Sequence, residues 1–307
     1  MRTAPDPPLG MAIRRAAISA TLASSVYNTQ PWRFVLGPSS LEVHADWTRR
    51  LVVLDPRGRQ LLISCGCAIF NARVALAAAG HGVAVAMLPD SDQPDLWARL
   101  SVSDAGPDHD PIASLGPELT TRRTNLQPTE VGPLAEGVIE ALIAAAEAEG
   151  AELLPVTRAE HRRTVGRLNR EAQDEERRDL AFVAELRAWT NTDPHRRDGL
   201  PPAALADAQD TVEDGHQCLL LLGTRHDTPI AWVGAGQALE RVFLEVARRG
   251  LAVRPMMHLI QVASTQARLR AELELTIHPH VLLRVGHAAS TPAPRRRRFA
   301  DMIEVSR

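Results

Sequence analysis

The chain has 307 residues, which is enough for one large domain or two of ordinary size. Its formal net charge is −2 and all 35 basic residues are arginine, so the charge gives no general attraction to nucleic acid or anionic membranes. Three cysteines are too few for a disulfide framework and fit a reducing compartment, which leads us to expect a cytoplasmic protein. Residues 1–10 lack the apolar core of an export signal, and no apolar run reaches the ~18 residues of a membrane span.

Apolar periodicity predicts helices and strands along most of the chain. The strongest helix is 60–79, which has almost no polar face and should be buried on most sides. A second long helix is predicted at 235–249, ended by Gly250. The remaining predicted helices are 11–23, 94–100, 133–149 and one or two within 158–188. The predicted strands are 32–36, 41–45, 83–87, one near Ser101, 151–156, 217–223 and 279–286.

The two long helices resemble each other at an offset of 170 residues. Gly66 and Gly80 have the same spacing as Gly236 and Gly250, and a short apolar run follows each helix. Two buried helices in an alanine-rich chain could match by chance. An internal duplication would instead give two halves, 1–115 and 116–307, related by a pseudo-twofold axis like a fused homodimer. The Pro- and Gly-rich segment 105–117 supplies the candidate boundary.

Polar side chains gather in the segment between the first predicted helix and strand. Ser24, Ser25, Asn28 and Gln30 lie within seven residues, and Pro31 should favour extended backbone before it. A rigid turn of this composition can bind a planar heterocycle that needs both hydrogen-bond donors and acceptors, such as the ring of a flavin. A simple helix-to-strand connector would also be rich in these turn-forming residues.

The run from Asn28 to Phe34 (Asn-Thr-Gln-Pro-Trp-Arg-Phe) resembles the N-x-Q-P-W-x-F signature of the FMN-dependent nitroreductases, with Ser24 where that family usually has proline. Those proteins build each FMN site across a dimer interface. One subunit supplies this loop, and the other supplies arginine-containing elements. Here the arginine elements, 122–125 and 294–296, lie in the second half, which has no second N-x-Q-P-W. The chain therefore resembles the Acg-type branch of single-chain pseudo-dimers, which implies an α+β nitroreductase-like fold, internally duplicated, with one FMN site.

The resemblance also implies which residues bind FMN. Guanidinium groups match phosphate oxygens, so the arginine elements should hold the phosphate, while the loop lines the ring and ribityl chain. The backbone near Met256 should approach the N5 and O4 edge of the flavin. Leu126 stands where the family commonly has a basic residue near N1 and O2, which should disfavour the anionic reduced flavin, with Gln127 as a partial substitute. The implied set is Ser24, Ser25, Val26, Asn28, Gln30, Arg122, Arg123, Thr124, Arg295, Arg296 and Met256.

Two functions follow from the resemblance. The first is an NAD(P)H-dependent flavin oxidoreductase acting on nitroaromatics, quinones or a similar small-molecule electron acceptor. The second is a flavin-binding or sequestering protein with little turnover. Neither needs a catalytic side chain, because the flavin carries the redox chemistry. We expect no metal and no nucleic-acid or membrane partner, and either a monomeric pseudo-dimer or a further homodimer.

The segment 189–208 has no helical or strand period and is a candidate lid over the flavin. Trp189 could either cap the ring or anchor the segment on the helices of 158–188. Other sequence features are weak. The segment 234–236 lacks the third glycine of a dinucleotide-binding fingerprint, and 278–280 lacks a further metal ligand. His216 and His258 are interpreted as core or surface residues rather than as bases.

Overall fold

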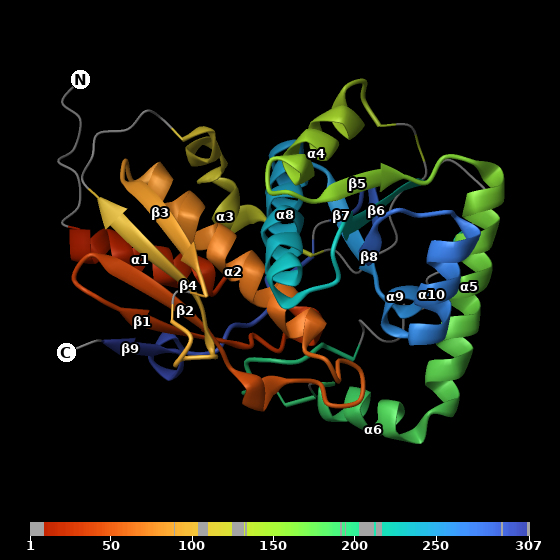
Figure 1. The fold of residues 1–307 in the computed structure, drawn as a ribbon, viewed down its shortest axis with the longest axis horizontal. Helices are drawn as coiled ribbons and strands as arrows, with labels where there is room; N and C mark the ends of the chain where they lie inside the picture. The colour runs from red at the N-terminus through yellow and green to blue at the C-terminus, as the bar shows by residue number, and fades with distance from the viewer. Residues whose placement is uncertain are drawn as a thin grey trace.

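The computed structural model describes residues 9–88, 90–103, 110–124, 132, 134–190, 192–193, 195–202, 212, 217–289 and 291–305. They form two halves, each with a sheet and a long helix, that lie side by side in Figure 1. The two long helices, α2 (Arg59–Ala78) and α8 (Pro229–Arg248), pack against each other at the centre. The predicted α+β class is confirmed.

The first half holds a five-stranded sheet in the order β3-β4-β2-β1-β9. Residues 94–100 are predicted as a helix, but 94–95 form a turn and 96–100 are the start of strand β4. Alternate side chains from Leu96 to Val102 are buried, and this period of two prevails over the helix-starting signal of Pro94. The elements are α1 (Leu9–Ala20), η1 (Val26–Asn28), β1 (Trp32–Leu36), β2 (Ser40–Ala45), η2 (Trp47–Arg49), α2, β3 (Gly82–Met87), β4 (Leu96–Ser103), η3 (Pro111–Leu115) and α3 (Glu118–Thr121).

The second half holds a four-stranded antiparallel sheet in the order β5-β6-β8-β7. The charged stretch predicted as one or two helices forms two, which lie at the outer edge of the molecule in Figure 1. The elements are α4 (Val138–Glu147), β5 (Glu152–Pro155), α5 (Ala159–Arg178), α6 (Leu180–Ala188), β6 (Cys218–Thr224), α8, β7 (Ala252–Met256), α9 (His258–Gln261), α10 (Ala263–Glu272), β8 (His278–Gly286), η4 (Phe299–Asp301) and β9 (Ile303–Val305).

The two halves correspond element by element. Helix α8 begins and ends 170 residues after helix α2 does (229 − 59 = 170 and 248 − 78 = 170). Strand β7 likewise begins 170 residues after strand β3 (252 − 82 = 170). The strand order β3-β4-β2-β1 of the first sheet is matched by β7-β8-β6-β5 in the second. This shared topology supports the internal duplication.

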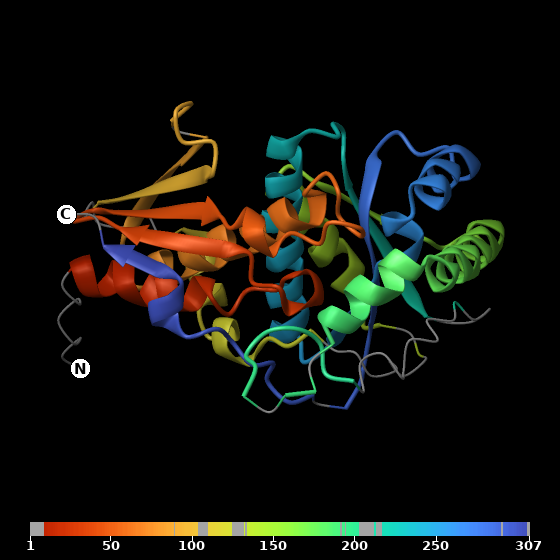
Figure 2. The same ribbon diagram turned by 90° about the horizontal axis from the view of Figure 1, so that it is seen from below.

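Strand β9 crosses from one half to the other. It follows the second half in sequence, yet it pairs in parallel with β1, with Phe34 opposite Ile303. Figure 2 shows the C-terminal tail, in blue, running back to the first half and ending beside β1. The division of the chain between residues 115 and 116 stays a prediction, and the tail adds a strand to the first sheet.

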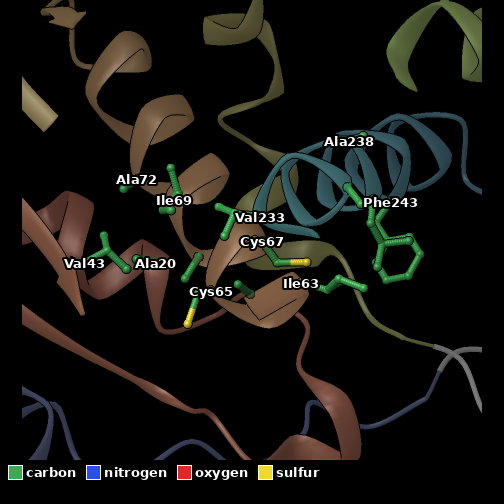
Figure 3. Close-up of a cluster of buried hydrophobic side chains, with 14 of the residues drawn as sticks. Ala20, Val43, Ile63, Cys65, Cys67, Ile69, Ala72, Val233, Ala238 and Phe243 are labelled. Atoms are coloured by element: carbon green, nitrogen blue, oxygen red, sulfur yellow. The ribbon is translucent and has the colours of Figure 1, made fainter. Parts of the chain in front are cut away.

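The central helices approach closely because two glycines face each other. A Cβ atom built on Gly66 would lie 2.1 Å from the carbonyl oxygen of Val233, and one built on Gly236 would lie 2.0 Å from that of Ile63. Figure 3 shows Ile63 and Cys67 of α2 beside Val233 and other side chains of α8. Among the described helices, α2 alone has the length and hydropathy of a membrane span, but 78% of that window is buried, as in the core helix of a folded domain.

Candidate functional site

The loop after α1 holds a strained backbone. Tyr27, Asn28 and Gln30 have φ values of 45°, 54° and 50°, a left-handed conformation that non-glycine residues rarely adopt. The extended backbone expected before Pro31 is therefore wrong. Two hydrogen bonds to the loop backbone favour this conformation over the extended backbone that a following proline prefers. The amide of Val26 donates to Ser64 Oγ at 3.1 Å, and the amide of Gln30 donates to Ser25 Oγ at 3.1 Å.

The two amide side chains of the loop join segments that are far apart in the sequence. Asn28 Nδ2 donates to the carbonyls of Gly199 and Arg295, each at 3.2 Å. Gln30 Nε2 donates to the carbonyl of Arg197 at 2.9 Å, and its Oε1 accepts the amide of Arg297 at 2.8 Å. The loop thus fixes both the segment around residue 198 and the C-terminal tail.

A cavity of about 870 Å³ opens beside this loop, between the two halves. Its volume lies in the upper part of the ~300–1,000 Å³ range of pockets for cofactors and small molecules. Both central helices, β7, α5, α6, α9 and the tail contribute to its walls. Of the predicted residues, those that line it are Ser24, Ser25, Val26, Asn28, Thr124, Arg295 and Arg296.

Arg122 does not line the cavity, because it is part of a buried ion pair. Its Nε lies 2.9 Å from Oε1 of Glu240, and the two side chains are 3% and 0% exposed. Arg122 Nη2 donates to the carbonyl of Leu22 at 2.6 Å, and Nη1 donates to Thr124 Oγ1 at 3.3 Å. The other carboxylate oxygen of Glu240 accepts the amide of Ser24 at 3.2 Å. Arg122 therefore supports the part of the cavity wall that holds Ser24 and Thr124, without lining the cavity itself.

Three other predicted residues also lie outside the cavity lining. Gln30 is fully buried and uses its side chain for the hydrogen bonds described above. Arg123 Nη1 donates to the carbonyls of Thr120 and Arg122. Met256 is fully buried in the second half's core, while its neighbour Met257 lines the cavity. Leu126, Gln127 and His216 lie outside the described residues.

Arg296 places a half-buried positive charge in the cavity wall. Its Nη1 donates to Asn28 Oδ1 at 2.7 Å, and its Nη2 donates to the carbonyls of Leu22 and Ala23 at 2.9 and 3.1 Å. Its buried Nε has no hydrogen-bond partner among the described residues. Burial, together with the nearby charge of Arg122, lowers the pKa of Arg296 to about 9. A half-buried cation with an unused buried donor can be stabilised by an anion, so this end of the cavity suits a phosphate.

The far wall of the cavity is polar on α5 and α9 and apolar on α6. Glu176 Oε2 lies 2.5 Å from His258 Nδ1, and both residues line the cavity. Gln173 and Gln261 line it as well, with Phe182 on the apolar side. The interpretation of His258 as a core or surface residue missed this wall, because the pairing with Glu176 spans 82 positions that show no shared pattern (258 − 176 = 82).

The segment that follows α6, around residue 198, is held against the cavity by ion pairs and hydrogen bonds. Asp198 pairs with Arg49 and Arg196, and although burial raises its pKa, the hydrogen bonds from these two arginines hold the pKa below its usual value. The guanidinium groups of the same two arginines each lie 5.4 Å from the ring centroid of Trp189. Trp189 also packs against the apolar cluster of Leu51, Leu54 and Phe182. Residues 198–201 line the cavity and Trp189 does not, so Trp189 is an anchor. Residues 191, 194 and 203–208 of the candidate lid lie outside the described residues.

A smaller cavity of about 230 Å³ occupies the pseudo-symmetric position in the other half. Its lining includes Arg73, Val85, Met87 and Gln237, and each of these is offset by 170 from a residue that lines the large cavity: Phe243, Pro255, Met257 and Cys67. Arg73 pairs with Glu149 at 2.5 Å and donates to Gln237 at 2.9 Å, so the guanidinium in this lining already has partners. The two equivalent positions are therefore unequal in size and chemistry.

No protein-family model matches the chain. It is 30% identical over 324 residues to a protein of Mycobacterium tuberculosis strain H37Rv provisionally named NAD(P)H nitroreductase Rv3131, covering 95% of this chain and 91% of the relative. It is 24% identical to the provisionally named NAD(P)H nitroreductase acg of the same strain, covering 92% and 91%.

Two solved structures are also similar. The FMN and NADPH-dependent nitroreductase NfnB from sphigopyxis sp. strain HMH is 19% identical, with a TM-score of 0.44 over 62% of this chain and 97% of that one. A BluB-like flavoprotein from Clostridium difficile 630 is 13% identical, with a TM-score of 0.45 over 61% and 96%. The resemblance predicted from the loop motif is confirmed by the sequence relatives. At 30% identity over nearly the full length of both proteins, the chain belongs to the NAD(P)H nitroreductase family.

Proposed function

We propose that this protein binds one FMN in the 870 Å³ cavity and acts as an NAD(P)H-dependent oxidoreductase on a small-molecule acceptor such as a quinone or a nitroaromatic. Family membership supports the class of reaction, because the relatives are provisionally named NAD(P)H nitroreductases. The single observation that carries the cofactor assignment is Arg296, a half-buried cation whose buried Nε has no hydrogen-bond partner among the described residues, in a cavity bordered by the strained loop.

The residues present fit FMN. Arg296 and the exposed Arg295 would hold the phosphate, and Ser24 and Thr124, whose hydroxyls lie 3.3 Å apart, stand in the same wall. Ser25 and Val26 would lie along the flavin, held by their bonds to the loop backbone and to Ser64. When bound, FMN supplies the electron transfer between NAD(P)H and the acceptor. The chain's part is to bind and orient the two reactants and to restrict water.

A second candidate, a flavin-binding protein with little turnover, is favoured by the clamped segment. Residues 198–201 line the cavity and are fixed by Asp198 and by hydrogen bonds to Asn28 and Gln30. If this segment stays closed, a nicotinamide cannot reach the flavin. Anaerobic reduction of the bound FMN by NADPH separates the two candidates, since only the oxidoreductase is bleached rapidly.

The phosphate assignment is tested with tail variants. Arg295→Gln and Arg296→Gln are each expected to weaken FMN binding by about 1.5–3 kcal/mol, which is roughly 10- to 150-fold in Kd. Fluorescence titration with FMN measures the effect. Arg298→Gln is the matched control, because Arg298 is exposed in the same tail and does not line the cavity. Wild-type affinity in both Arg295→Gln and Arg296→Gln would show that the phosphate lies elsewhere.

A further inference from the structure

Two insertions break the correspondence between the halves. Helices α5 and α6 lie between β5 and β6, where the first half has only the tight turn between β1 and β2. Helices α9 and α10 lie between β7 and β8, where the first half joins β3 to β4 through 88–95. The inserted helices pack on one another, with α5 against α9 and α10, at one end of the molecule in Figure 1. The two insertions thus form one structural unit that the first half lacks.

This unit supplies a wall of the large cavity with unused hydrogen-bonding groups. Gln261, from α9, has neither its Nε2 nor its Oε1 hydrogen-bonded within the part of the chain that the structure describes. Gln173 Nε2 and Glu176 Oε1, from α5, also have no hydrogen-bond partner among those residues. All three side chains line the cavity. Buried polar groups without partners are costly, so a ligand that satisfies them gains affinity.

The pattern of these groups specifies a ligand. Gln261 offers a donor and an acceptor on one planar amide, and a carboxamide is a group that complements both, through two N–H···O=C bonds. Glu176 Oε1 provides an acceptor for a further N–H. Phe182, Val183 and Leu186 of α6 line the same cavity and provide an apolar surface for an aromatic ring. The wall therefore suits an aromatic carboxamide, and a carboxylate in its place would lack the donors and be repelled by Glu176.

We propose that this wall is the subsite for the nicotinamide head group of the reductant, with Gln261 binding its carboxamide. The inference rests on the proposed function, since it places NAD(P)H in the cavity beside FMN. It assigns a role to the inserted helices: they make one of the two pseudo-symmetric positions a site for two reactants. Gln261 is a specificity-determining residue rather than a participant in electron transfer.

The test compares two ligands that differ only in this group. The oxidised, FMN-loaded full-length protein is titrated with NAD⁺ and with nicotinic acid adenine dinucleotide, in which a carboxylate replaces the carboxamide, and Kd is followed through the flavin absorbance. NAD⁺ should bind at least about tenfold more tightly. Gln261→Leu and Gln261→Met should reduce this ratio to about threefold or less. Gln217→Leu is the control, because Gln217 Oε1 also has no hydrogen-bond partner among the described residues but Gln217 does not line the cavity, and this variant should keep the wild-type ratio.

The FMN affinity of each variant is measured in parallel. Unchanged FMN affinity with lost discrimination supports the subsite. Wild-type discrimination in both Gln261 variants, or no discrimination in the wild-type protein, would overturn it. Loss of FMN affinity in the Gln261 variants would also overturn it, by placing Gln261 against the flavin. If the wild-type protein binds no FMN, the proposed function itself fails and the subsite with it.

Discussion

Replacing Arg122 by alanine is expected to lower the free energy of unfolding by about 3–5 kcal/mol, because it leaves a buried carboxylate without its counter-charge. Glu240 is 0% exposed, and its two carboxylate oxygens contact the guanidinium of Arg122 and the amide of Ser24. The carbonyl of Leu22 would also lose the guanidinium. Urea denaturation monitored by circular dichroism measures the loss.

A double variant separates the buried charge from other effects of the substitution. Arg122→Met combined with Glu240→Leu removes both charges with similar volumes, and such replacements of buried pairs are often neutral or stabilising. The double variant should therefore be more stable than Arg122→Ala. If Arg122→Ala loses FMN affinity but almost no stability, then Arg122 contacts the phosphate, as the sequence resemblance predicts, and the ion pair is not its main role.

Gly236→Ala is expected to destabilise the protein by about 3 kcal/mol or more, at or above the upper end of the usual cost of overpacking. The added Cβ would lie 2.0 Å from the carbonyl oxygen of Ile63 and 2.9 Å from the Cα of Gly66. Both neighbours are backbone atoms of α2, so relief requires the two central helices to move apart. Both helices also line the cavity proposed for FMN, so the affinity for FMN should fall as well.

Gly234→Ala is the matched control. It lies on the same helix, and a Cβ atom there meets nothing within 4 Å. Replacing a helical glycine by alanine at such a position should stabilise the protein by about 0.5–1 kcal/mol. Thermal unfolding of both variants checks the pair. Equal melting temperatures for Gly234→Ala and Gly236→Ala would contradict the close approach of the two helices.

The sequence predicted the features that depend on local pattern. The apolar composition of α2 predicted its burial, and short apolar runs predicted strands β1 and β2. The matching glycines predicted the offset of 170 between the two long helices. The correspondence extends further than the glycines indicated, since the strand order is shared as well. The loop motif also identified the family, because five specified residues within a span of seven are unlikely to match in order without common descent.

The features that the sequence did not predict depend on distant partners. Arg122 reads as a phosphate ligand until Glu240, 118 positions later, is found beside it (240 − 122 = 118). Gln30 reads as a flavin contact until the tail amide of Arg297 accounts for its Oε1. Strand β9 has only three residues and pairs with β1 through a register that no local pattern carries. In each case the structure shows a single long-range contact that no nearby residue indicates.

The most direct test of the account is the flavin content of the purified protein. After incubation with excess FMN and removal of free flavin by gel filtration, absorbance of the released flavin against protein concentration gives the stoichiometry. We predict one FMN per chain. The large cavity suits the cofactor, whereas the pseudo-symmetric one has about 230 Å³ and is lined by Arg73, which pairs with Glu149. Retention of no flavin would contradict the cofactor assignment, and two FMN per chain would contradict the inequality of the two positions.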